Sequence, residues 1–215
     1  MHISHNINEM VEVNFNNKLK EIKSTLQIWK SRNLTLLGKI TLIKNFALSK
    51  LVYPFSVFPN PSEHFFKNLD SILYDFLWNT TPDKVKRRTM ILSYSDGGLT
   101  MPDCRSFCKV LKIAWVKRFY DKADDVRWKL LFANAIDHFG GDLLFKCNFH
   151  HDEPFIDQIK NRFVQDVVKS WAMVHFKQPE KCIDILNEVI WYNSSLKVGK
   201  KVFSGKIGME KVLCV

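Results

Sequence analysis

The sequence lacks the features of a secreted or membrane-spanning protein. Its five cysteines are an odd number at scattered positions among 215 residues, and they form no paired disulfide framework. The N-terminal stretch MHISHNINEMVEVNFNN has neither the apolar core of a signal peptide nor the arginine-rich character of a transit peptide. No run approaches the roughly 18 apolar residues that a membrane span needs. We therefore expect a soluble intracellular protein, nuclear or cytoplasmic, with no transmembrane segment.

Motifs that carry catalysis or bind cofactors are also missing. The chain contains no glycine-rich phosphate loop, no serine in a nucleophile elbow and no HExxH sequence. Cys104 and Cys108 lie four residues apart in a predicted helix, but no second pair follows at zinc-finger spacing, so burial is the favoured interpretation. Cys147, His150 and His151 lack an obvious fourth zinc ligand. We expect no catalytic residue, no metal site and no cofactor, with zinc at this second cluster as the minor alternative.

Positive charge is what the sequence has in excess. Lys and Arg number 32 against 22 Asp and Glu, which gives a net charge of +10, and the pI is about 9.4. Residues 1–120 hold 18 basic and 9 acidic side chains, whereas residues 121–215 hold 14 and 13. This asymmetry favours a phosphate backbone as the partner, because neutralising phosphates releases condensed counterions. A generally basic protein without a polyanionic ligand is the alternative.

Periodic apolar residues predict a mostly α-helical fold. Helices are expected over residues 17–31, 35–53, 60–78, 103–120, 124–140, 155–176 and 179–191. Thr35, Asn60 and Asp103 are the predicted N-caps, and Pro54 and Gly140 are predicted to end helices. Turn-forming residues predict short β-hairpins near residues 88–100 and 195–204. The predicted domains are an irregular lead-in (1–14), a helical bundle (15–80), a basic connector (81–101) and a second helical region (102–215).

The basic side chains of the first half form two groups. In the predicted helix after Thr35, apolar residues recur at spacings of three and four, which leaves lysines on the other side. This face has no neighbouring array of Asn or Gln that would read base edges, so we expect it to contact phosphates. The second group lies in the basic connector. Together, the predicted nucleic-acid-binding residues are Arg32, Lys39, Lys44, Lys50, Lys84, Lys86, Arg87 and Arg88.

Aromatic residues make up 13% of the chain and could serve as platforms on which bases stack. Most of them fall on apolar stripes, so core packing is the favoured interpretation for the majority. Three lie close to basic residues and loop boundaries, where a ring can be half exposed: Trp29, Tyr53 and Tyr94.

Seven landmarks occur in one order along the sequence. They are WKSRNLTLLGKITLIK with SKLVYP (29–54), FLWN (76–79), DKVKRR (83–88), GGLTMPD (97–103), KVLKIAWVKR (109–118), GGDLLFKCNF (140–149) and VIWYNSSLKVGKKVF (189–203). In this order they resemble the segment downstream of the polymerase palm in reverse transcriptases of LINE-type (non-LTR) retrotransposons. The resemblance covers roughly residues 17–203.

The resemblance implies the thumb of such a polymerase and the region beyond it. The parent enzyme grips the template RNA and the primer duplex with its thumb, so the implied partner is the backbone of RNA or of an RNA/DNA hybrid. The implied fold for residues 15–80 is a thumb-like helical bundle. The palm, which carries the metal-binding aspartates, and the endonuclease are absent from this chain. The resemblance therefore implies a non-catalytic fragment of the enzyme.

Asp124 and Asp125, a few residues after Tyr120, could be mistaken for the paired carboxylates of a polymerase. That pair requires a strand hairpin that holds two metal ions between the primer end and the nucleotide. Here the two acids lie between two predicted helices. We interpret them as helix-capping residues that offset the helix dipole.

Two further hypotheses are compatible with the sequence. A helical protein-interaction module would present apolar patches for self-association or for a partner, with the charge serving solubility. A degenerate fragment would have no selected function. A surface with contiguous basic residues supports nucleic-acid binding, and scattered charge around exposed aromatic residues supports the interaction module.

Overall fold

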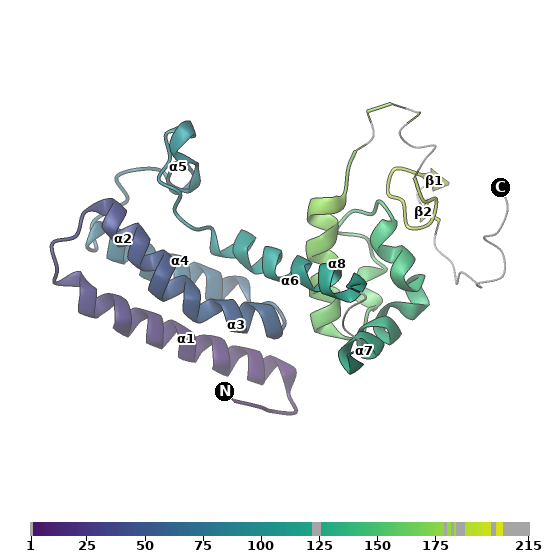
Figure 1. Ribbon diagram of the computed structural model, residues 1–215, viewed down its shortest axis with the longest axis horizontal. Coiled ribbons are helices and arrows are strands. Elements are labelled where there is room, and N and C mark those ends of the chain that lie inside the picture. The colour runs from purple at the N-terminus through teal and green to yellow at the C-terminus, as the bar shows by residue number, and fades with distance from the viewer. Residues whose placement is uncertain are drawn as a thin grey trace. The chain divides into compact units, whose positions relative to one another are not determined.

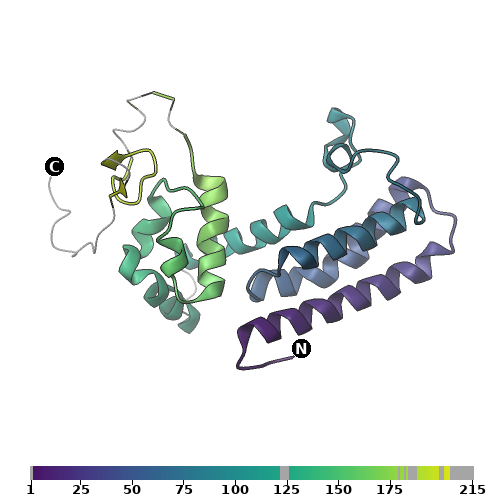
Figure 2. The same ribbon diagram turned by 180° about the vertical axis from the view of Figure 1, so that it is seen from behind.

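The computed structural model describes residues 2–121, 126–178, 180–181, 183, 188–198 and 201–203. The chain is mostly α-helical, as predicted. It divides into two compact units, Met1–Leu111 and Lys112–Val215, and the boundary falls inside helix α6 (Cys104–Tyr120) (Figures 1 and 2). The connector predicted at residues 81–101 belongs to the first unit, because Met90 and Met101 are buried in its core.

Six α-helices or parts of helices build the first unit in the described residues, with two short segments of other helix types. In chain order these elements are α1 (Ile7–Lys30), α2 (Leu36–Leu42), the π-helix η1 (Ile43–Leu48), α3 (Ser49–Val57), α4 (Glu63–Trp78), α5 (Arg87–Ile91), the 3-10 helix η2 (Tyr94–Asp96) and the start of α6.

Helix α1 begins at Ile7, inside the stretch 1–14 that the sequence predicts to be irregular. Asn6 is its N-cap, and the side-chain oxygen accepts the backbone N–H groups two and three residues further on, at 3.0 and 3.4 Å. Phe15 is fully buried, and its ring centre lies 4.9 Å from that of Phe65. The cap and this buried ring extend the helix beyond its predicted start.

Pro54 lies inside helix α3, although the sequence predicts that it ends the helix. Its missing N–H removes one helix hydrogen bond, at a cost of about 3 kcal/mol. Leu51 and Phe55, on either side of it in the sequence, are fully buried, and each such side chain contributes about 1.5–3 kcal/mol. Packing therefore offsets the lost bond, and the helix continues to Val57.

Helix α4 matches its prediction except at the N-cap. Ser62 holds that position, and its hydroxyl accepts the N–H of Phe65 at 3.4 Å. The side-chain oxygen of Asn60, the predicted cap, instead accepts a hydrogen bond from Sγ of Cys108 at 3.3 Å. At the other end of the helix, Asn79 adopts a left-handed conformation with φ 50°.

The β-hairpin predicted near residues 88–100 does not form, and α5 and η2 occupy the segment instead. The backbone N–H groups of Leu99 and Met101 both donate to the carbonyl oxygen of Met90, at 3.2 and 2.9 Å. Gly98 permits this close return of the chain, because a Cβ at that position would lie 2.1 Å from a backbone oxygen of Leu92. The segment is thus anchored to the core without a strand ladder.

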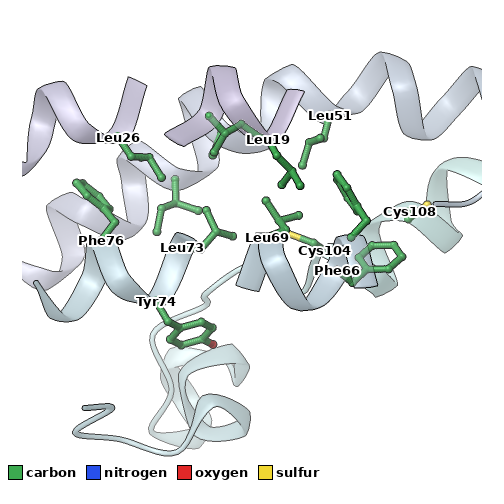
Figure 3. Close-up of a cluster of buried hydrophobic side chains, with 14 of the residues drawn as sticks. Leu19, Leu26, Leu51, Phe66, Leu69, Leu73, Tyr74, Phe76, Cys104 and Cys108 are labelled. Carbon is green, nitrogen blue, oxygen red and sulfur yellow. The ribbon is translucent and has the colours of Figure 1, made fainter. Parts of the chain in front are cut away.

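The core of the first unit lies between α1, α3 and α4. Figure 3 shows Leu19 of α1 and Leu51 of α3 close to Leu69 of α4, with Leu26 of α1 and Leu73 of α4 further along the same interface. All five side chains are buried. These helices share one hydrophobic core, which also includes residues outside the predicted bundle at 15–80, such as Val11 and Met90.

Helix α6 begins directly after Asp103, as predicted, and Oδ1 of Asp103 accepts the N–H of Arg105 at 3.1 Å. The guanidinium of Arg105 donates to Asp70 and Glu63 of α4, each at 2.6 Å. This fork joins the start of α6 to α4.

The second unit is built on shorter elements. After the end of α6 come α7 (Arg127–Ile136), the 3-10 helices η3 (Asp137–Phe139), η4 (Gly141–Lys146) and η5 (Ile156–Gln158), α8 (Arg162–His175), and the strands β1 (Lys197–Val198) and β2 (Lys201–Val202). The two strands pair antiparallel, which confirms the hairpin predicted near residues 195–204. The helix predicted at 155–176 begins only at Arg162, because Asn161 caps it there.

Some predictions fall outside the described residues. They are the acid pair at 124–125 and residues 179, 182 and 184–187 of the helix predicted at 179–191. Within that range, the described residues 180–181 and 188–191 are not helical. Lys112 of α6 is fully buried, and its ammonium lies 4.5 Å from the ring centre of Phe163. In the described part of the chain, no helix has the length and apolar content that a bilayer crossing requires.

Candidate nucleic-acid interface

The structure removes Lys39 from the predicted phosphate-binding face. This residue is only 6% exposed, and its ammonium donates to the carbonyl oxygens of Phe76 and Leu77, at 3.1 and 3.0 Å, and to Oδ1 of Asn79 at 2.8 Å. The two carbonyl oxygens belong to the last turn of α4, where backbone carbonyl groups have no hydrogen-bond partner within the helix. Burial lowers the pKa of Lys39, and the positive charge of Lys30 lowers it further. The side chain is a structural cap, and helical-wheel position alone does not reveal it.

Lys44 and Lys50 are half-buried, and each already contacts another side chain of the protein. The ammonium of Lys44 donates to Oγ1 of Thr100 at 2.7 Å. The ammonium of Lys50 lies 3.9 Å from Oε2 of Glu21, a carboxylate that Lys18 contacts at 2.8 Å. The hydrogen bond from Lys18 lowers the pKa of Glu21. These two lysines therefore present less free charge than the sequence predicts.

Arg32 is exposed and lies over the ring of Trp29, which in turn lies against Phe46. Its guanidinium lies 4.5 Å from the ring centre of Trp29, whose own centre is 5.9 Å from that of Phe46, with the two rings tilted by 35°. Phe46 lies in the π-helix η1 and is 42% exposed. We name Arg32, Trp29 and Phe46 the stacked triad. It joins a cation to partly exposed rings, the combination on which unpaired bases stack.

A groove between α1 and α4 supplies basic residues that the sequence reasoning missed. It encloses a volume of about 500 Å³, and Lys23 and Lys30 of α1 line one side. Polar groups on its walls include Gln27, Asn68, Ser71, Asp75 and Thr80. The polar side of the first helix could have identified these residues, because Lys23 and Lys30 are seven residues apart and therefore lie on the same helix face.

The stretch of sequence that supplies the groove lysines carries charge of one sign. From Ile22 to Ser62 the sequence contains no Asp or Glu, while its basic residues are Lys23, Lys30, Arg32, Lys39, Lys44 and Lys50. The one carboxylate among the groove residues is that of Asp75 on α4, which accepts a hydrogen bond from Ser71 at 3.4 Å. A surface with this balance attracts polyanions from a distance.

The second predicted group, residues 84–88, is exposed throughout. Arg87 differs from the others, because it contacts Oδ2 of Asp83 at 2.7 Å and lies 4.2 Å from the ring centre of Tyr74 on α4. Burial raises the pKa of Tyr74 to about 12, so its hydroxyl stays neutral. Arg87 thus anchors the segment, and Lys84, Lys86 and Arg88 are the members that extend into solvent.

The cysteines are buried where the structure describes them, as predicted for Cys104 and Cys108. Cys147 is buried as well, its Sγ donates to the carbonyl oxygen of Leu143 at 3.2 Å, and burial raises its pKa to about 12. It therefore does not join His150 and the neighbouring histidine in a metal cluster. No protein-family model matches this chain.

Proposed function

We propose that the first unit binds the sugar-phosphate backbone of RNA or of an RNA/DNA hybrid, as a non-catalytic part of a LINE-type reverse transcriptase. One observation carries the proposal: the acid-free stretch Ile22–Ser62 contributes Lys23 and Lys30, which line the α1–α4 groove, and the exposed Arg32. The sequence landmarks that resemble the family's post-palm region support the same partner. A thumb that must slide over any template needs backbone contacts rather than base readout.

The residues assigned to this role differ from those that the sequence alone predicts. The primary set consists of Lys23, Lys30 and Arg32. Lys23 and Lys30 line the α1–α4 groove, and Arg32 is exposed and follows Lys30 by two residues in the sequence. Lys84 and Arg88 belong to the second set, with Lys86. Uncharged groove residues such as Gln27 and Thr80 add hydrogen bonds to phosphate oxygens, which position a backbone without reading its sequence.

The test of this function is equilibrium binding to labelled RNA/DNA hybrid, single-stranded RNA and duplex DNA of several sequences. Backbone recognition gives affinities that differ little between sequences and fall as salt rises. Binding confined to one sequence, or no binding at low salt, contradicts the proposal. Incorporation of nucleotides on a primed template by the purified chain would contradict its non-catalytic part.

A protein-interaction module is the second candidate, and one observation favours it. Exposed apolar side chains follow the α2–η1–α3 segment, among them Leu37, Phe46, Val52, Tyr53 and Val57. Apolar side chains that recur along one segment are typical of protein contacts. Sedimentation at increasing protein concentration tests this candidate: association that weakens on Val52→Ser supports it, and a monomer at every concentration contradicts self-association.

A further inference from the structure

Three side chains of the ligand type converge at one turn of the second unit, and the proposed nucleic-acid interface does not use them. They are His150, His151 and Asp152, the one group of three or more His, Cys, Asp or Glu side chains close enough to share an ion in the described part of the chain. Nδ1 of His150 lies 3.4 Å from Oδ2 of Asp152, and Nε2 of His151 lies 3.3 Å from Oδ1. All three are at least partly exposed to solvent.

These separations match a metal site in length. Ligand atoms that sit 2.0–2.1 Å from a tetrahedral zinc ion are about 3.4 Å from one another. Both histidine-to-aspartate separations have this length, and all three ligand atoms lie within 4.8 Å of one another. The two separations end on different oxygens of the Asp152 carboxylate, and Nδ1 of His150 also accepts the backbone N–H of Asp152 at 3.4 Å.

The donor set selects a class of ion. Two imidazoles with one carboxylate suit Zn²⁺ and the neighbouring late first-row divalent ions, whereas Mg²⁺ and Ca²⁺ prefer sites made of oxygen atoms. We propose that His150, His151 and Asp152 bind one zinc-class divalent ion, with solvent in the fourth position. The ligand set differs from the one that the sequence suggests, because Asp152 takes the place of the buried Cys147.

Hydrogen bonds hold this turn in shape before any ion arrives. The N–H of Glu153 donates to the carbonyl oxygen of His150 at 3.2 Å, which closes a β-turn around the ligands. The hydroxyl of Ser194 accepts the N–H of His150 at 2.8 Å and donates to Oε1 of Glu153 at 2.7 Å. The ring of Phe176 stands nearly perpendicular to that of His150, with centres 5.3 Å apart. A preformed turn lowers the entropic cost of binding.

Space for solvent ligands is present beside the turn. A cavity of about 650 Å³ opens there, bounded by His150, Asp152, Glu153, Phe176, Gln178, Ser194 and Ser195. The carboxylate of Glu153 accepts the Ser194 hydroxyl through Oε1, and water from the cavity supplies the fourth ligand. Because the turn is closed by its own hydrogen bonds, the ion adds to stability by mass action and is not required for folding.

The test uses the full chain with any affinity tag removed. Zn²⁺ is titrated by calorimetry, and Co²⁺ is titrated in parallel, because its visible spectrum reports the coordination geometry. We expect one equivalent of each ion to bind, and neither Mg²⁺ nor Ca²⁺ to compete. His150→Gln, His151→Gln and Asp152→Asn should each weaken Zn²⁺ binding about tenfold or more. His138→Gln, an exposed histidine of the same unit, is the matched control and should leave binding unchanged.

Other results overturn the proposal. Absence of Zn²⁺ binding does so directly. Equal binding by the His150→Gln/His151→Gln double variant shows that histidines elsewhere hold the ion, and abolition by Cys147→Ser in a folded protein shows that the ligand set is wrong. Far-ultraviolet circular dichroism, recorded with and without chelator, checks that every variant is folded. Nucleic-acid binding is measured separately, so failure of the metal site leaves the proposed function untouched.

Discussion

The ammonium of Lys39 donates to the side-chain oxygen of Asn79 at 2.8 Å and thereby joins α2 to the end of α4. The same ammonium serves two carbonyl oxygens of the last turn of α4, so one buried side chain caps the helix. A lysine that the sequence assigns to nucleic acid is thus part of the fold.

The first prediction concerns this cap. Lys39→Met keeps the length of the side chain but leaves the carbonyl oxygens of Phe76 and Leu77 without their donor, so we expect a loss of about 2–3 kcal/mol in the free energy of unfolding. Lys23→Met, on the exposed side of α1, is the control and should change it by less than about 0.5 kcal/mol. Urea denaturation measures both, and equal stabilities of the two variants would contradict the capping role.

The second prediction concerns the stacked triad. Phe46→Leu should weaken binding of single-stranded RNA by about 1 kcal/mol or more, since each stacked base contributes about 1–3 kcal/mol, and should affect a duplex little. Val52→Ala, another exposed position on the same segment, serves as the control. Fluorescence anisotropy of labelled oligonucleotides gives the affinities. Equal losses for single strand and duplex would exclude base stacking on this ring.

The third prediction concerns thiol reactivity. Burial raises the pKa of Cys104 and of Cys147 to about 12, so neither forms the reactive thiolate near pH 8 in the folded protein. We expect alkylation by iodoacetamide at both residues only after unfolding in urea, as read by mass spectrometry of the peptides. Rapid alkylation of either residue in the native protein would show that its surroundings open to solvent.

The fourth prediction concerns pH. Burial lowers the pKa of His175 below its ordinary 6.5, and the charge of Lys177 lowers it further. The unfolded chain then binds more protons than the folded one, so His175 favours folding above pH 6.5 and this contribution is lost as pH falls through the lowered pKa. His175→Gln should flatten the fall in melting temperature between pH 7 and 5. An identical pH profile in both proteins would remove His175 as the cause.

Helices with strong local signals could be predicted from the sequence. Helix α4 combines a polar N-cap with a wide apolar stripe, and Asp103 marks the start of α6, so both elements, and the residues that α4 buries, followed from the pattern. The predictions that failed depend on distant partners. Pro54 remains helical because its neighbours in the sequence are buried, and the start of α1 depends on contacts of Phe15 with rings far along the chain.

For the candidate interface, too, features that depend on local sequence could be predicted and features that depend on distant partners could not. The excess of positive charge in the first half of the chain could be read from composition, because counting charged residues requires no knowledge of their contacts. Which lysines reach solvent could not, since Lys39 and Lys44 are engaged by Asn79 and Thr100, forty and fifty-six residues away in the sequence. Asp152 directly follows the two histidines in the sequence, but the turn geometry is needed to show that it, and not the buried Cys147, lies within ligand distance of them.

The salt dependence of hybrid binding tests the central claim most directly. Anisotropy titrations of a labelled RNA/DNA hybrid at increasing salt give a slope of log K against log salt, for which we predict about −2 to −4 if three or four phosphates are neutralised at roughly 0.7–0.9 per contact. Lys30→Gln with Arg32→Gln should flatten that slope by about 1.5 and weaken all sequences alike. The matched pair Lys146→Gln with Lys160→Gln, both exposed in the second unit, should leave it unchanged. A slope near zero, or one that both double variants change equally, would contradict the assignment of this surface to a nucleic-acid backbone.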